Sequence, residues 1–247
     1  MAGWEFWLIA CAAAVAVGLS KGGLPAVGML AVPVLALALP PVTAAGLLLP
    51  VYVLSDLLGL VAYRRGFDRR LFAILAPPMT FGILLGWYLA AAVPERLVTG
   101  VIGAIGLLFS AWLVLARRPQ GPPLRPRLLP GLFWGTVAGF TSFVSHAGGP
   151  PYQVYVLPLR LSKIGFAATT TVVFAYVNAV KLVPYWALGQ LSPANLRVAA
   201  VLFVPAGLAV LAGVWLVRVL PERWFFGLVT AALAAVSLRH LWTALAG

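Results

Sequence analysis

The chain of 247 residues has few charged residues, and this scarcity excludes an ordinary soluble globular protein. Charged side chains make up 9% of the sequence, hydrophobic ones 63%, and the mean hydropathy is +1.04. A soluble core cannot hide that much apolar side chain. The chain also has one cysteine, Cys11, so an intramolecular disulfide is excluded, and Cys11 is expected to pack as a small core residue. The composition predicts an all-α integral membrane protein.

Several motifs of catalysis and energy coupling are absent as well. The sequence contains neither H-E-x-x-H nor G-x-S-x-G, and no grouping of histidines and carboxylates suited to a metal ion. A membrane-embedded enzyme is therefore disfavoured, and no cofactor or metal is expected. The phosphate-binding motif G-x-x-x-x-G-K-[ST] is also missing. Any energy for transport should come from an ion gradient or from the substrate's own gradient, unless a separate ATPase subunit is used.

Acidic residues are scarce, with five against 17 lysines and arginines, giving a formal charge of +12. The arginines gather in short segments between apolar stretches, which indicates membrane topology rather than nucleic-acid binding. No lysine or arginine precedes the N-terminal apolar run, so the n-region of a secretory signal peptide is missing, and the run is expected to belong to the mature protein.

Long apolar stretches predict the membrane spans, since a spanning helix needs roughly 20 mostly apolar residues. Two further regions, 4–40 and 130–159, are long enough to cross twice but are interrupted by glycine and proline. The predicted spans cover residues 42–63, 71–92, 97–116, 164–188, 196–219 and 224–246.

An internal repeat organises the chain. At an offset of 127 residues the Pro-Glu-Arg turn at 94–96 matches the one at 221–223, with flanking matches Pro78/Pro205, Gly86/Gly213 and Gly100/Gly227. With a slightly shorter offset, Gly18 pairs with Gly139 and Asp56 with Asn178. We therefore predict a first repeat at 1–116, a cytoplasmic linker rich in Arg and Pro at 117–129, and a second repeat at 130–247.

The distribution of arginine favours an inverted second repeat, because inversion leaves more Lys and Arg in the cytoplasm than a parallel repeat does. Inversion requires an odd number of crossings per half. Residues 4–40 and 130–159 must then each enter and return as a broken hairpin, made of two short helical pieces or of two full crossings. The prediction is about 5+5 helical segments with both termini outside.

The two Gly/Pro interruptions occupy corresponding places, GLSKGGLPAVGMLAVP at 18–33 and GFTSFVSHAGGPPYQVYVLP at 139–158. Paired breaks of this kind point to a transporter's binding site, because unwound backbone in a membrane needs protein or water partners. Kinks that only aid packing are the alternative. Four ionisable residues lie within the apolar segments, and their cost in lipid predicts that they face the interior: Lys21, Asp56, His146 and Lys181.

These patterns yield a predicted anion site. Asn178 and Lys181 are three residues apart and share a helix face. Asp56 and His146 are candidates for proton coupling, and no metal ligand is predicted. Three alternatives stay open: a lysine–Asp56 ion pair between the halves, a His146 that only caps broken backbone, and hydroxyls that bond their own helix. The predicted substrate-binding residues are Lys21, Gly22, Gly23, Thr141, Ser142, Ser145, His146, Gly148, Gly149, Gln153, Asn178 and Lys181.

Taken together, these motifs resemble the TauE/SafE sulfite exporter family of bacterial permeases. The likeness lies in G-x-x-K-G-G-x-x-x-x-G-x-x-x-x-P at 18–33, G-F-x-S-x-x-x-H-A-G-G-P at 139–150, the Asn178-x-x-Lys181 pair and the two-fold repeat. One departure stands out, because the first break has Lys21 where the second has Ser142, which implies a site with one charged wall.

The resemblance implies a multi-pass transporter in the bacterial cytoplasmic (inner) membrane. Its expected partners are the lipid bilayer, a small sulfur-containing anion such as sulfite, sulfoacetate or another organosulfonate, and a proton as coupling ion, without nucleic acid. It implies the class of substrate and no particular member. A passive anion channel, or a transporter of another small organic anion, is the alternative.

Overall fold

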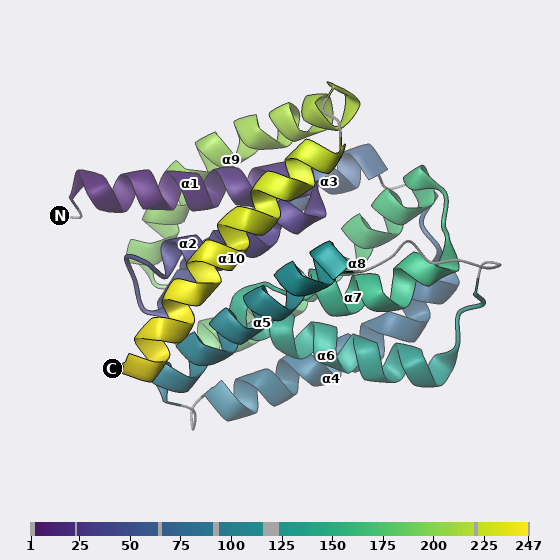
Figure 1. Ribbon diagram of the computed structural model, residues 1–247, viewed down its shortest axis with the longest axis horizontal. Coiled ribbons are helices and arrows are strands. Elements are labelled where there is room, and N and C mark those ends of the chain that lie inside the picture. Colours follow the sequence, from purple (N-terminus) through teal and green to yellow (C-terminus); the bar gives the residue numbers. More distant parts are fainter. Residues whose placement is uncertain are drawn as a thin grey trace.

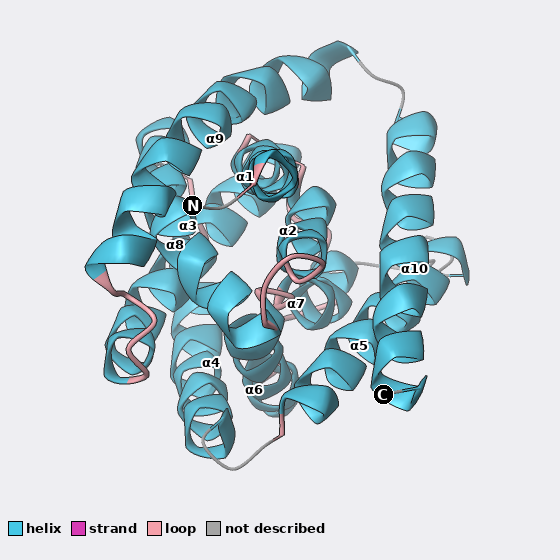
Figure 2. Cartoon of the chain, turned by 90° about the vertical axis from the view of Figure 1, so that its left-hand side faces the viewer, coloured by secondary structure: helices cyan, strands magenta, loops and turns pink. Residues whose placement is uncertain are grey.

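The computed structural model describes residues 3–22, 24–63, 66–90, 94–115, 124–219 and 222–246. All regular secondary structure in this part of the chain is helical, which confirms the predicted all-α class (Figure 2). Its elements are α1 (Trp4–Lys21), η1 (Pro25–Leu30), α2 (Ala31–Leu35), α3 (Pro41–Tyr63), α4 (Arg69–Ala90), α5 (Glu95–Leu115), α6 (Leu128–Ser145), α7 (Gly149–Val156), η2 (Leu157–Leu159), α8 (Lys163–Ala187), α9 (Pro193–Val219) and α10 (Glu222–Ala246).

Among the described residues, six helices are long and apolar enough to cross a membrane: α1, α3, α4, α6, α8 and α9. The chain is therefore a multi-pass membrane protein. Helices α5 and α10 cover the two remaining predicted spans, 97–116 and 224–246. Gly18 and Gly139, which begin the two broken segments, do not interrupt α1 or α6, because a glycine inside a helix costs only about 1 kcal/mol.

The two predicted hairpins combine one long and one short leg. Helix α1 ends at Lys21 and the chain returns as η1 and α2, while α6 ends at Ser145 and the chain returns as α7 and η2. The outgoing legs have 18 residues each, but α2 has five residues and α7 has eight. With the 3₁₀ pieces η1 and η2 included, each return leg has 11 residues, which at about 1.5–2.0 Å per residue span roughly 16–22 Å of a hydrocarbon core about 30 Å thick. Neither hairpin is thus two short pieces or two full crossings.

The helices pack in pairs that join the two parts of the sequence. Helix α1 lies against α9, α4 against α6, α3 against α8 and α5 against α10 (Figure 1). Glycines allow the closest approaches, because a Cβ on Gly18 would collide with the Ala206 carbonyl of α9, and one on Gly139 with the Met79 carbonyl of α4. Small residues at helix contacts are typical of membrane proteins.

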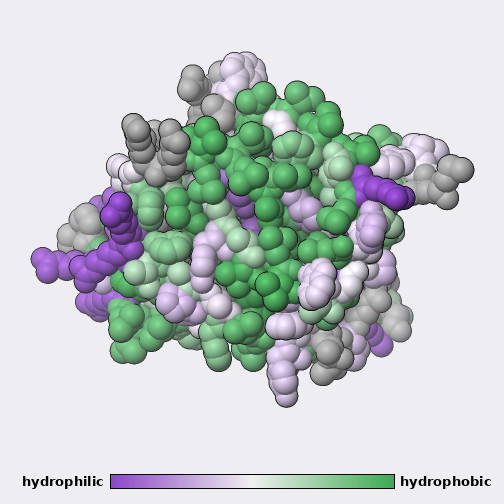
Figure 3. Space-filling view, turned by 180° about the vertical axis from the view of Figure 1, so that it is seen from behind, coloured by the Kyte–Doolittle hydropathy of each residue, from purple (hydrophilic) through white to green (hydrophobic). Residues whose placement is uncertain are grey.

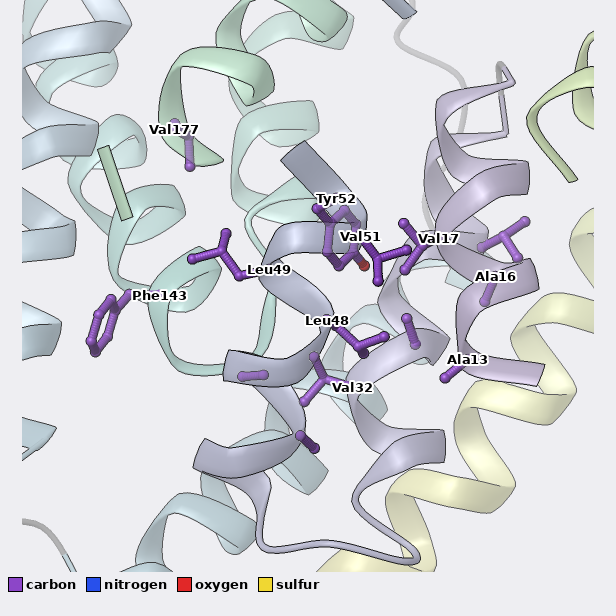
Figure 4. Close-up of a cluster of buried hydrophobic side chains, with 14 of the residues drawn as sticks. Ala13, Ala16, Val17, Val32, Leu48, Leu49, Val51, Tyr52, Phe143 and Val177 are labelled. Atoms are coloured by element: carbon purple, nitrogen blue, oxygen red, sulfur yellow. The ribbon is translucent and has the colours of Figure 1, made fainter. Parts of the chain in front are cut away.

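Apolar side chains fill the interior and also cover the outside. The core near the first hairpin contains Val17 of α1, Val32 of α2 and Leu48 of α3 (Figure 4). On the outside, hydrophobic residues form a broad zone with hydrophilic residues at two opposite edges (Figure 3). Large exposed side chains such as Leu208 and Leu211 belong to this apolar surface. An apolar surface of this kind suits contact with lipid.

Both ends of the described chain lie on one side of the molecule. The start of α1 and the end of α10 appear at the same edge in Figure 1. The start of α5 joins them there, because the Arg96 guanidinium donates hydrogen bonds to the carbonyls of Ala244 and Leu245.

Candidate functional site

The first group of site residues lies where α3 and α8 meet the tip of the first hairpin. The Lys21 ammonium is 2.5 Å from Asp56 Oδ1. On the other side of the same carboxylate, Asn178 Nδ2 donates to Asp56 Oδ2 at 2.6 Å. Asp56 and Asn178 are both buried. A carboxylate in an apolar surrounding needs such partners, because an unpaired charge there is costly.

Lys181 forms the second group, with residues of the second hairpin. Its side chain is fully buried. Its ammonium lies 3.1 Å from the Ser142 carbonyl, 3.2 Å from Ser142 Oγ and 2.6 Å from His146 Nδ1. An ammonium has three hydrogens to donate. These three acceptors therefore use the hydrogen-bonding capacity of Lys181 completely.

His146 holds the turn of the second hairpin. It follows α6 with a left-handed backbone, φ 53°, and its N–H donates to the Ser142 carbonyl. A residue other than glycine rarely adopts this conformation, which needs support from its surroundings. That support comes from the ring, because Nε2 lies 2.9 Å from the Ala45 carbonyl on α3. A carbonyl only accepts, so Nε2 donates, and Nδ1 is then the acceptor for Lys181. Both ring nitrogens are engaged.

Tyr52 connects the two groups, and the sequence analysis missed it. Its ring stacks on His146 with centroids 4.5 Å apart and 22° between the planes. The Lys21 ammonium lies 5.4 Å from the centre of the same ring, and the Tyr52 hydroxyl donates to the Gly28 carbonyl at 2.8 Å. Tyr52 is four residues before Asp56 on α3, so helical spacing from the only interior carboxylate was a usable signal.

A cavity of about 70 Å³ lies between the two hairpin breaks. Its volume has room for a few water molecules or one small oxyanion. Sequence reasoning missed the three wall residues that α8 contributes, because they carry no charge: Thr170, Thr171 and Phe174. The wall is formed by Ser20, Lys21, Gly28, Met29, Tyr52, His146, Gly149, Thr170, Thr171 and Phe174.

Two hydroxyls of the predicted site bond their own helix. Thr141 Oγ1 donates to the Val137 carbonyl at 2.9 Å, and Ser145 Oγ donates to the Thr141 carbonyl at 3.3 Å. Both bonds follow the helical i−4 pattern that serine and threonine commonly make. The donors of these two side chains are therefore turned to backbone.

The remaining predicted residues are spread around the cavity. Gly22 packs against Val210 and Gly213 of α9, and Gly148 packs beside Ser142 and Phe174. Gln153 is half-buried on α7 and is absent from the cavity wall formed by the described residues. Gly23 lies outside the described residues.

The start of α7 offers few backbone N–H donors to the cavity. Pro150 and Pro151 follow Gly149 and have no N–H to donate. The N–H of Tyr152 is already bonded to the Gly148 carbonyl. Gly149, the first residue of α7, lines the cavity. Helix dipoles therefore add little here, and the positive charge of the wall comes from Lys21.

Comparison with known proteins identifies one family. The family model described as sulfite exporter TauE/SafE matches residues 10–241, which is nearly the whole chain. No curated protein and no solved structure matches the sequence significantly. The match includes both hairpins, the helices α3 and α8, and every residue of the cavity wall.

Proposed function

The chain belongs to the TauE/SafE sulfite exporter family and is a multi-pass membrane transporter rather than an enzyme, and from this premise we propose that it is a secondary transporter of a small sulfur oxyanion, such as sulfite or an organosulfonate. The observation that carries the proposal is the cavity between the two hairpin breaks, because both breaks contribute to its wall: the first with Ser20, Lys21, Gly28 and Met29, the second with His146 and Gly149. The membrane is the bacterial cytoplasmic membrane.

Lys21 is the proposed ligand of the anion. Lys181 is fully buried and Lys21 is mostly buried, but the three acceptors around Lys181 leave it no hydrogen for a substrate. Lys21 has a single ionic partner among the described residues, Asp56, and it lines the cavity. An arriving oxyanion can therefore replace or join Asp56 at the Lys21 ammonium. The wall also contains the Thr171 hydroxyl, whereas the Thr170 hydroxyl donates to the Tyr152 hydroxyl and the Ser20 hydroxyl to the Val17 carbonyl.

Asp56 is the proposed coupling residue. Substrate and carboxylate compete for the same ammonium, so a proton on Asp56 favours anion binding by removing the competing negative charge. Anion and proton then travel together. His146 was the second candidate, but its two nitrogens are occupied by Ala45 and Lys181, which favours a positioning role.

We also propose that residues 1–116 and 130–247 are inverted repeats joined by the linker 117–129. The support is the reciprocal packing, in which the first helix of each unit lies on the fourth helix of the other: α1 on α9 and α6 on α4. Their contact glycines, Gly18 and Gly139, are partners in the sequence repeat. Rocking of one unit against the other would expose the cavity to alternate sides.

A flux assay in proteoliposomes tests the function. Wild-type protein is expected to take up labelled sulfite or sulfoacetate, and Lys21→Ala is expected to lower the flux at least about ten-fold by removing the charge that meets the anion. Arg197→Ala, which removes an exposed arginine on α9, is the matched control and should transport normally.

A second variant guards against a merely destabilised fold, because Lys21→Ala leaves Asp56 without its counter-charge. The double variant Lys21→Met/Asp56→Asn removes both charges together and should fold, yet it should not transport. Normal flux in this double variant would contradict the proposed site. Counterflow exchange by the wild type separates a transporter from an open pore, which shows none.

A further inference from the structure

A second and larger cavity lies on the side of the molecule that holds both chain termini (Figure 1). We call it the α10 cavity, and its volume is about 370 Å³. It lies between the turn that joins α2 to α3, the start of α5 and the last turns of α10. Its wall is formed by residues 36–41, Thr99, Arg239, His240 and Thr243. None of these residues belongs to the wall of the cavity between the two hairpin breaks, which we call the central cavity.

Arg239 is the only charged residue in this wall. Its side chain is exposed, and no acidic side chain of the described residues pairs with it. The neighbouring Arg96 is different, because its guanidinium is bonded to the Ala244 and Leu245 carbonyls at the end of α10. Arg239 is thus an uncompensated guanidinium in a cavity, on the side where the predicted topology disfavours arginine.

His240 gives the cavity a rigid polar wall. Its side chain is 4% exposed, and Nε2 lies 2.8 Å from the Pro33 carbonyl on α2. That carbonyl lacks its usual helical donor, because the Leu37 N–H bonds to Val34 instead. His240 Nε2 therefore donates to Pro33, which leaves Nδ1 without a hydrogen-bond partner among the described residues. The ring is held in place with one nitrogen still available.

We propose that the α10 cavity is a second oxyanion-binding site, in which the Arg239 guanidinium holds a sulfonate or phosphate group. The planar fork of a guanidinium matches the oxygens of such groups, and the wall contains no carboxylate to repel them. The group is carried either by a soluble anion or by a lipid headgroup, since the site lies at the membrane edge.

The test uses protein in which the central site is disabled, so that the two sites are read separately. Lys21→Met/Asp56→Asn protein is placed in nanodiscs of phosphatidylcholine and titrated with sulfoacetate in a calorimeter. Binding should remain, should weaken at least about ten-fold when Arg239→Ala is added, and should weaken less with Arg239→Lys, which keeps the charge without the fork. Arg197→Ala is the control and should change nothing.

A second arm detects a lipid. Wild-type protein and its Arg239→Ala variant are each placed in nanodiscs that contain phosphatidylglycerol, and the lipids that each protein retains are counted by native mass spectrometry. Loss of phosphatidylglycerol in Arg239→Ala, without sulfoacetate binding in the first arm, supports the site and assigns the headgroup as its ligand. If Arg239→Ala alters neither binding, or Arg197→Ala weakens binding equally, the α10 cavity is no oxyanion site. Neither arm depends on flux through the central cavity.

Discussion

Lys21 and Lys181 are the same residue type at similar depth, yet their surroundings give them different capacities. Lys181 has three acceptors within hydrogen-bonding distance, whereas Lys21 has one carboxylate and an aromatic ring. The first arrangement ties α8 to the turn of the second hairpin. The second leaves an ammonium whose partner can be exchanged. Replacement of Lys181 is therefore expected to lower stability, and replacement of Lys21 is expected to lower transport.

Replacing Lys181 should mainly affect stability. Lys181→Met keeps the length of the side chain but leaves His146 Nδ1 without its donor and the Ser142 carbonyl with only the His146 backbone N–H, at a cost of about 2 kcal/mol. Thermal unfolding in detergent, followed by tryptophan fluorescence, should show a clearly lower midpoint than for the wild type. The double variant Lys21→Met/Asp56→Asn should unfold closer to the wild type, and a reversed order would reject this division of roles.

Tyr52 should act through its position, since it contacts both hairpins. Tyr52→Phe removes the hydroxyl that donates to Gly28 and keeps the stack on His146, so a loss of about 1 kcal/mol is expected. Tyr52→Leu also removes the stack and should cost more. The two unfolding midpoints give the comparison, and equal midpoints would mean that the ring contact contributes nothing.

At the scale of elements, close helix contacts hold the two outgoing hairpin legs. Gly18 in α1 faces the backbone of α9, and Gly139 in α6 faces the backbone of α4. Backbone cannot move aside as the end of a flexible side chain can. These contacts keep α1 and α6 in register with the helices that oppose them, and thereby set the distance between the two breaks.

An added methyl group at either contact should separate the helices. Gly18→Ala and Gly139→Ala are each expected to lower stability by about 1–3 kcal/mol through overpacking. Gly207→Ala is the matched control on α9, because nothing lies within 4 Å of a Cβ added there. It should unfold at or above the wild-type midpoint, since alanine favours helix over glycine by about 1 kcal/mol. A midpoint for Gly139→Ala equal to that of Gly207→Ala would contradict the packing argument.

At the scale of the whole molecule, the membrane orientation is the main consequence of the fold. The helix ends near both termini share one edge, and hydrophilic residues mark two opposite edges of an apolar surface (Figures 1 and 3). The arginine distribution predicts that the edge with the termini faces outward.

Cysteine accessibility measures this orientation. In a Cys11→Ala background, single cysteines at Gly3 and Ala246 should both react with an impermeant reagent added to intact cells. A cysteine at Arg70, in the first turn of α4, should react only after the cells are opened. Labelling of Gly3 and Ala246 from opposite sides would exclude an even number of crossings, and with it the inverted arrangement.

Much of the fold and part of the site could be predicted from local sequence properties. Hydropathy predicted the helices, and the cost of ions in lipid predicted that Asp56, His146 and Lys181 face inward, as all three are buried. The hairpin legs were not predicted, because Gly18 and Gly139 read as breaks in isolation and become contact positions only when another helix approaches. Tyr52 and Thr170 were missed because uncharged residues in an apolar chain give no energetic signal of their own.

The sequence by itself determined that this protein lives in a membrane, is all-helical and belongs to a transporter family, since apolar length, scarce charge and ordered motifs are properties of the chain. Only the tertiary structure decided which lysine can exchange its partner for a substrate anion. The sequence shows two lysines in apolar segments and does not distinguish them. The number of acceptors around each depends on distant residues: Ser142 lies 39 positions from Lys181, and Asp56 lies in another helix than Lys21. Hydrogen-bond saturation is a property of three-dimensional neighbours, which no local pattern contains.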